Sequence, residues 1–132
     1  MVIVLFICVQ NAGRSQIAEA IFNKLSDGSH RAISAGSNPA EKVNPIVVEA
    51  LTDLGIDISD KKPKKLTKEI VQESDIAITM GCGYDVCPVV PNELREWKID
   101  DPKDKSLVDV RVIRDDIYKK VSNLLSELDE TR

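Results

Sequence analysis

An eight-residue segment near the start of the chain combines the residue types that bind and attack an oxyanion. Cys8 is followed six residues later by Arg14 and then by Ser15. A loop of this length can turn successive backbone N–H groups inward, which creates an anion-binding nest at the start of a helix. The arginine can hold two oxygens of a tetrahedral oxyanion at once. The residues expected to bind the anion are Val9, Gln10, Asn11, Ala12, Gly13 and Arg14.

The same segment also contains a candidate nucleophile. The positive end of a helix and a neighbouring guanidinium favour a thiolate over a thiol, so Cys8 is expected to be nucleophilic at neutral pH. Ser15 can donate its hydroxyl to that thiolate, although a plain helix N-cap is the alternative for this serine. Asn11 can brace the loop with its side-chain amide. For Cys8 the alternative is an inert small hydrophobe at the end of a strand.

A carboxylate followed by proline provides a candidate acid. Pro102 restricts the backbone conformation of the preceding Asp101. This segment can therefore hold one carboxyl group over the anion site. An anion bound beside that carboxyl group favours its protonated form, which can donate a proton to a leaving group. Asp101 is therefore the candidate general acid, and Asp100 is the less suitable neighbour. Taken alone, an Asp-Asp-Pro segment is more typical of a simple turn than of an acid catalyst.

The two other cysteines, Cys82 and Cys87, lie far from Cys8 in the sequence. Three thiols cannot all pair within one chain, and structural zinc needs four ligands whereas the chain has a single histidine. Neither a disulfide framework nor a zinc site is expected. Cys82 comes just after the predicted strand 76–80, and hence at the same end of a parallel sheet as Cys8. Two loop cysteines with no redox role are the alternative.

Apolar runs and helical periodicity alternate along the chain. Asn44-Pro45 and Thr67 are typical of helix starts. Strands that alternate with helices predict an α/β fold, with a mainly parallel sheet and helices on both faces. The loops after Cys8, after the third strand and around Asp101 should meet at the carboxyl ends of the strands. The predicted strands are 1–8, 30–35, 76–80 and a short one around 97–99, and the predicted helices contain 17–25, 45–54, 70–71 and about 108–129.

Length and charge exclude several classes of protein. The chain has 132 residues, which predicts one domain covering residues 1–132. Its formal net charge of -4 argues against a general binder of nucleic acid or of anionic membranes. No apolar run approaches the roughly 20 residues that a membrane-spanning helix needs. We therefore expect a soluble, cytoplasmic protein.

Residues 8–15 resemble the anion loop of the low-molecular-weight protein tyrosine phosphatase superfamily. The next residues, Gln16 to Glu19, resemble its arsenate reductase branch, because the phosphatases usually have proline after the Arg-Ser pair. The resemblance covers most of the chain and implies a three-layer α/β fold with a four-stranded parallel sheet flanked by helices. It also implies that Asp101 is the general acid. Further matching segments, in the same order, are Ser34-Ala35-Gly36, Asn44-Pro45, Gly55-Ile56-Asp57-Ile58-Ser59, Cys82 with Cys87-Pro88, and Trp97 through Asp100-Asp101-Pro102.

The resemblance implies a relay of three thiols. Cys8 would attack arsenate, Cys82 would attack the resulting adduct and release arsenite, and Cys87 would then resolve the Cys8–Cys82 disulfide. The final Cys82–Cys87 disulfide would be reduced from outside. The short interval between these two cysteines, with Gly81 before them, resembles members coupled to low-molecular-weight thiols as well as archaeal-type members. The implied reductant is therefore thioredoxin or a low-molecular-weight thiol.

Some members of the superfamily bind potassium beside the anion loop, through positions that match Asn11, Glu19 and Ser34. The position that matches their loop aspartate is Lys64 in this chain. The ammonium group of Lys64 could take the place of the cation. We therefore expect no bound metal and no cofactor.

Three other functions are compatible with some of these residues. A low-molecular-weight protein tyrosine phosphatase would need the anion site and Asp101 but neither Cys82 nor Cys87. A single-cysteine arsenate thiol-transferase would take its second thiol from solution. An oxyanion-binding module without enzyme activity would need only the loop. Lys103, directly after Asp101-Pro102, and a low aromatic content of 4% favour the reductase over the phosphatase. We expect the protein to act as a monomer.

Overall fold

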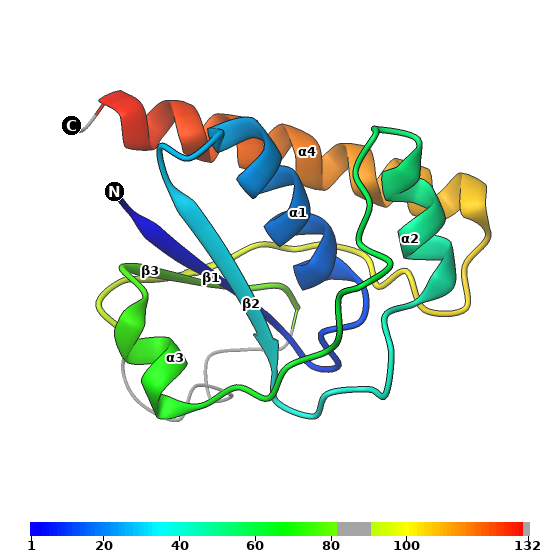
Figure 1. Cartoon of the computed structure of the whole chain (residues 1–132), viewed down its shortest axis with the longest axis horizontal. Helices are drawn as coiled ribbons and strands as arrows, with labels where there is room; N and C mark the ends of the chain where they lie inside the picture. Colours follow the sequence, from blue (N-terminus) through cyan, green and yellow to red (C-terminus); the bar gives the residue numbers. More distant parts are fainter. Residues whose placement is uncertain (82–90, 131–132) are drawn as a thin grey trace.

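A computed structural model describes residues 1–81 and 91–130 of the chain (Figure 1). In this described part, no helix is both long enough and apolar enough to cross a membrane. The strands are β1 (Ile3–Cys8), β2 (Arg31–Gly36), β3 (Ile76–Thr79) and β4 (Leu94–Glu96), and the helices are α1 (Arg14–Ser26), α2 (Pro45–Thr52), α3 (Lys68–Glu73) and α4 (Leu107–Glu130). The elements follow the order β1-α1-β2-α2-α3-β3-β4-α4, and the long helix α4 runs across α1 and α2.

The sheet has the strand order β2-β1-β3-β4, and all of these pairings are parallel. β1 lies inside the sheet, where Cys8 pairs with Gly36 of β2 and Ile7 pairs with Thr79 of β3. Helices α1, α2 and α4 cover one face of the sheet, and α3 covers the other (Figure 1). Because both faces of β1 are covered, its almost continuous apolar sequence is what a buried strand requires. The predicted α/β fold with a parallel sheet is confirmed.

Side chains along β1 alternate between two apolar cores. Phe6 and Cys8 face the larger core with α1, α2 and α4, whereas Ile7 faces the smaller core with α3. The Phe6 ring lies 6.0 Å from that of Phe22 and 5.5 Å from that of Trp97, measured between ring centroids. This alternation directs the Cys8 side chain to the side of the sheet where α1 begins.

Two helix starts follow the capping pattern that the sequence predicts. The Asn44 side-chain oxygen accepts a hydrogen bond from the Ile46 N–H at 3.0 Å, and Pro45 takes the first position of α2. The Thr67 hydroxyl accepts from the Ile70 N–H at 3.2 Å and caps α3. Both caps satisfy N–H groups that have no partner within their own helix.

The fourth strand lies three residues earlier than predicted. The sequence pattern indicated 97–99, but β4 covers Leu94–Glu96. The Trp97 N–H still donates to the Thr79 carbonyl at 2.9 Å, and the chain then leaves the sheet. A strand was predicted at 97–99 because Trp97 and Ile99 are apolar. These two residues instead pack against the larger core beyond the end of β4.

Candidate active site

The sulfur of Cys8 lies at the base of the loop that joins β1 to α1, which we call the anion loop (residues 9–13). The Cys8 Sγ and the Ser15 Oγ are 2.8 Å apart, and the Asn11 Nδ2 donates to the same Ser15 Oγ at 2.7 Å. Because the Ser15 oxygen accepts from Asn11, its own proton is available to the sulfur. These three side chains are almost completely buried. The arrangement can therefore stabilise a Cys8 thiolate.

Ser15 is not the N-cap of α1. The residue in that position is Gly13, and no side chain caps this end of the helix. Of the two roles that the sequence left open for Ser15, the plain N-cap is therefore wrong. Its hydroxyl instead contacts the sulfur of Cys8.

The carbonyl groups of the anion loop are held on its outer side. The carbonyl oxygens of Val9, Gln10 and Ala12 accept hydrogen bonds from the backbone N–H groups of Asn38, Ala40 and Asn44, at 2.8, 3.0 and 2.9 Å. In a trans peptide the C=O and N–H point in opposite directions, so the N–H groups of these peptides face the inner side of the loop. The segment between β2 and α2 thus fixes the shape of the anion loop, through contacts that the sequence pattern did not indicate.

Asn11 adopts a left-handed conformation, with φ of 51°, and its side chain is held from two sides. The Asn11 Oδ1 accepts from the Lys64 backbone N–H at 2.8 Å and from the Gln16 Nε2 at 3.1 Å. Asparagine tolerates this backbone region better than most residues. From the sequence, Gln16 is only a mark of the arsenate reductase branch. Its amide is a support of the anion loop.

A cavity of about 230 Å³ opens above Cys8. The Arg14 Nη1 donates to the Ile99 carbonyl at 3.2 Å, and the Arg14 Nη2 lies 3.6 Å from the Asp101 carboxylate. The guanidinium is therefore held between the anion loop and the segment after β4. No aromatic side chain is among the described residues that line the cavity, which are Cys8, Val9, Gln10, Ala12, Gly13, Arg14, Asp101 and Lys103.

Asp101 and Lys103 also line the cavity, and we call residues 101–103 the Asp101 wall. The Asp101 Oδ1 accepts from the Lys103 backbone N–H at 3.0 Å. Pro102 is buried against Gly13, where an added Cβ would lie 2.6 Å from the Pro102 Cγ. Glycine at this position thus allows the wall to approach the loop. The carboxyl group of Asp101 is 57% exposed and faces the cavity beside Arg14.

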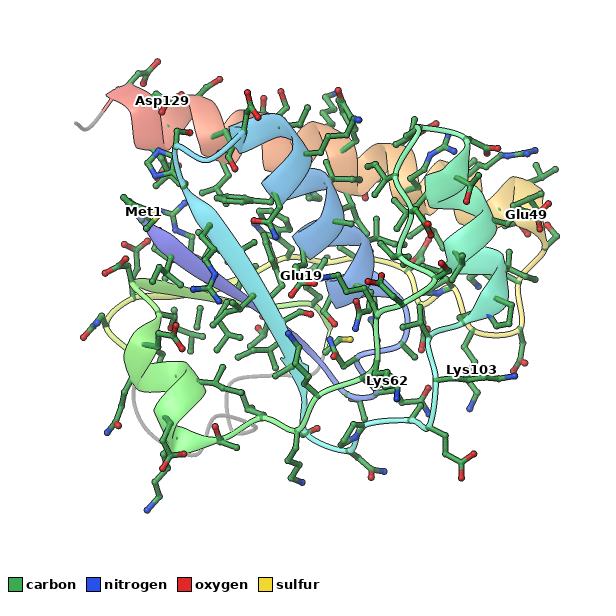
Figure 2. All side chains as sticks on the ribbon, viewed as in Figure 1. Met1, Glu19, Glu49, Lys62, Lys103 and Asp129 are labelled. Carbon is green, nitrogen blue, oxygen red and sulfur yellow. The ribbon has the colours of Figure 1, made fainter. Side chains whose placement is uncertain are left out.

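The structure brings Lys64, which is expected to take the place of a potassium ion, close to positions that match the potassium ligands of relatives. Glu19 lies on α1 beside β2 (Figure 2), and its Oε1 accepts from the Ser34 hydroxyl at 3.2 Å. The Lys64 ammonium lies 3.6 Å from the same carboxylate oxygen. The Lys64 backbone N–H donates to Asn11, so Lys64 contacts two of the three positions that match potassium ligands in relatives, Asn11 and Glu19. Residues 1–81 and 91–130 contain no group of three or more histidine, cysteine, aspartate or glutamate side chains that could hold a metal.

Cys82 and Cys87 lie outside the described residues, so their predicted relay is not tested by the structure. Gly81, the last described residue before them, contacts the Arg14 guanidinium. It has a φ of 90°, and a Cβ at this position would collide with the Arg14 Nη1. Gly81 therefore has a structural role at the cavity.

Comparison with known proteins agrees with this geometry. Residues 3–132 match the family described as low molecular weight phosphotyrosine protein phosphatase. The chain belongs to this family. An arsenate reductase of Halalkalibacterium halodurans is 35% identical over 129 residues, which cover 90% of this chain and 91% of that protein.

Two solved structures show the same fold. The thioredoxin-dependent arsenate reductase Cg_ArsC1' of Corynebacterium glutamicum is 40% identical, with a TM-score of 0.87, and the match covers all of this chain and 64% of the other. The low molecular weight protein tyrosine phosphatase of T. tengcongensis is 25% identical, with a TM-score of 0.88 over 96% of this chain and 99% of the other. The four-stranded sheet and its flanking helices are thus shared with both types of enzyme.

Proposed function

We propose that this protein is an arsenate reductase that converts arsenate to arsenite at Cys8. The observation that carries the proposal is the Cys8 sulfur, 2.8 Å from the Ser15 hydroxyl, in a small cavity that Arg14 and Asp101 also line. The cavity has the size and the charges for an inorganic oxyanion. The reductase relative and the reductase structure described above support this function over the phosphatase alternative.

In the first step, the backbone N–H groups of the anion loop and the Arg14 guanidinium bind arsenate. The Cys8 thiolate attacks arsenic, so that an As–S bond forms and an As–O bond breaks. Asp101 gives its proton to the departing oxygen, which leaves as water. Ser15 orients the sulfur through its hydroxyl. The substrate-binding residues remain Val9, Gln10, Asn11, Ala12, Gly13 and Arg14.

In the second step, the Cys82 thiolate attacks the sulfur of Cys8. An S–S bond forms, the electron pair of the As–S bond stays on arsenic, and arsenic(V) becomes arsenic(III), which is released as arsenite. Cys87 then attacks the Cys82 sulfur and frees the Cys8 thiolate. This relay is proposed from the sequence positions of the two cysteines.

An external thiol reductant must then reduce the Cys82–Cys87 disulfide. We propose thioredoxin, by analogy with the Corynebacterium glutamicum enzyme, with a low-molecular-weight thiol as the alternative. We further propose that residues 1–132 act as one domain and as a monomer in the cytoplasm, without cofactor or metal. Neither nucleic acid nor membrane is proposed as a partner.

A paired assay tests this function. Arsenate-dependent NADPH consumption with thioredoxin and thioredoxin reductase is measured beside hydrolysis of an aryl phosphate. Reduction without appreciable hydrolysis is the expected result. Hydrolysis without reduction would make the protein a phosphatase. Full activity of Cys82→Ser with a small external thiol would instead indicate a single-cysteine thiol-transferase.

A further inference from the structure

The Asp101 wall carries a second positive charge that the mechanism above does not use. Lys103 lines the cavity together with Asp101. Figure 2 shows Lys103 on the loop that leads into α4. Its ammonium forms no ion pair with any carboxylate in the described part of the chain.

Without Lys103, the positive charge around the cavity would not balance the two negative charges of a bound dianion. The titratable groups that line the cavity within the described residues are Cys8, Arg14, Asp101 and Lys103. Arg14 already lies 3.6 Å from the Asp101 carboxylate and donates to the Ile99 carbonyl. Its positive charge is therefore shared before any substrate enters. A dianionic oxyanion placed beside a thiolate gains from a second cation nearby.

The backbone of Lys103 is fixed relative to the cavity. Its N–H donates to the Asp101 Oδ1 at 3.0 Å, and the preceding Pro102 packs against Gly13. The backbone position from which the Lys103 side chain extends is thus fixed on the Asp101 wall. Because the bond to Asp101 uses the backbone, a change of the Lys103 side chain removes the charge without removing that bond.

We propose that Lys103 is a substrate-binding residue, whose ammonium compensates the second negative charge of a small inorganic oxyanion dianion. Arg14 holds the oxyanion through directed hydrogen bonds, whereas Lys103 acts mainly through its charge. This inference rests on the proposed function, since it concerns the same cavity. The attraction must weaken as ionic strength rises, because Lys103 is exposed to solvent.

The test measures binding of inorganic phosphate without turnover. Phosphate in the cavity protects Cys8 from alkylation by iodoacetamide, and mass spectrometry of the tryptic peptide 1–14 reports modification of Cys8 alone. Lys103→Met should raise the phosphate concentration for half-protection about five-fold at low salt, and this difference should shrink at high salt. Lys103→Arg should remain close to the wild type.

Lys105→Met is the matched control, since Lys105 is an exposed lysine of the same loop that does not line the cavity. It should bind phosphate as the wild type does. Equal phosphate affinity of Lys103→Met and the wild type, with unchanged thermal midpoints, would overturn the inference. An equal loss in Lys105→Met would also overturn it, because the effect would then be one of net charge.

The same experiment separates this inference from the proposed function. If phosphate protects Cys8 and Lys103→Met weakens that protection, the inference stands even when arsenate is not reduced. If arsenate is reduced but the variant binds phosphate normally, the reductase function stands and the inference fails. A wild type that phosphate does not protect would refute the inference, whereas the paired assay decides the reductase function.

Discussion

The anion loop and the Asp101 wall line one cavity, but the protein holds them in different ways. On the loop side, Asn11 and Ser15 are fully buried, and the side chain of Asn11 hydrogen-bonds to three neighbours. On the wall, the Asp101 carboxyl group is 57% exposed and its hydrogen bond is to a backbone N–H.

This difference separates binding geometry from proton transfer. A nest of N–H groups must be in place before the oxyanion arrives, because its value depends on precise donor positions. A general acid must exchange protons with solvent between turnovers, and exposure allows this. Substitutions in the loop should therefore affect stability and activity together, whereas substitutions in the wall should affect activity alone.

The largest effect is expected from Cys8→Ser. A serine hydroxyl is not appreciably ionised near neutral pH, so arsenate reduction should fall by about three orders of magnitude or more. Circular dichroism and the thermal midpoint should show an intact fold, because the two side chains have similar size. Turnover above a trace in this variant would remove Cys8 from the role of nucleophile.

Asp101→Asn should lower the turnover number about 100-fold, since the amide cannot donate an acidic proton. The Asn Oδ1 can still accept from the Lys103 N–H, so the urea midpoint should not change. Asp100→Asn, a change at the exposed neighbouring aspartate, serves as the control and should leave turnover near the wild-type value. Equal losses in the two variants would mean that Asp101 has no special role.

Asn11→Ala tests the loop as a structural unit. The change removes the bonds to Ser15, Lys64 and Gln16, and it places alanine at a φ of 51°. We expect a loss of about 2–4 kcal/mol in the free energy of unfolding, together with weaker phosphate binding. Asn38→Ala, at an exposed position, is the control. A stable Asn11→Ala protein would contradict the contrast between loop and wall.

A third region, between α2 and α4, provides a reference for the comparison of loop and wall. Substitutions there should lower stability slightly and leave activity unchanged. A hydrogen bond from the Arg111 guanidinium, aided by Arg114, lowers the pKa of Asp53 below its ordinary value of 3.8. A lowered folded-state pKa means that the ionised carboxylate stabilises the fold above the unfolded-state pKa. This contribution is lost as the pH falls through the folded-state pKa.

Asp53→Asn should therefore lower the urea midpoint slightly at neutral pH, and the difference from the wild type should disappear as the pH falls through the lowered folded-state pKa of Asp53. Arsenate reduction should be unchanged. Asp116→Asn, at an exposed carboxylate on α4, is the control and should leave the urea midpoint at neutral pH unchanged. A difference between Asp53→Asn and the wild type that persists in acid would mean that the lost stability comes from packing.

The sequence by itself determined the α/β architecture and the main parts of the site. The apolar run of β1 and the caps at Asn44 and Thr67 are local signals, because they depend on residues only a few positions apart. The spacing of Cys8, Arg14 and Ser15 is also local, so a nucleophile, an anion clamp and a hydroxyl could be predicted together. The asparagine-braced loop followed from the same segment.

Only the tertiary structure decided how these parts are held and what faces them. The outward carbonyls of the anion loop depend on the segment after β2, and the support of Asn11 depends on Lys64, which is 53 residues away. The position of β4 and the approach of Pro102 to Gly13 likewise depend on packing between distant segments. A periodic pattern predicts which side chains become buried. It does not predict the residues against which they pack, because these contacts depend on how the whole chain folds.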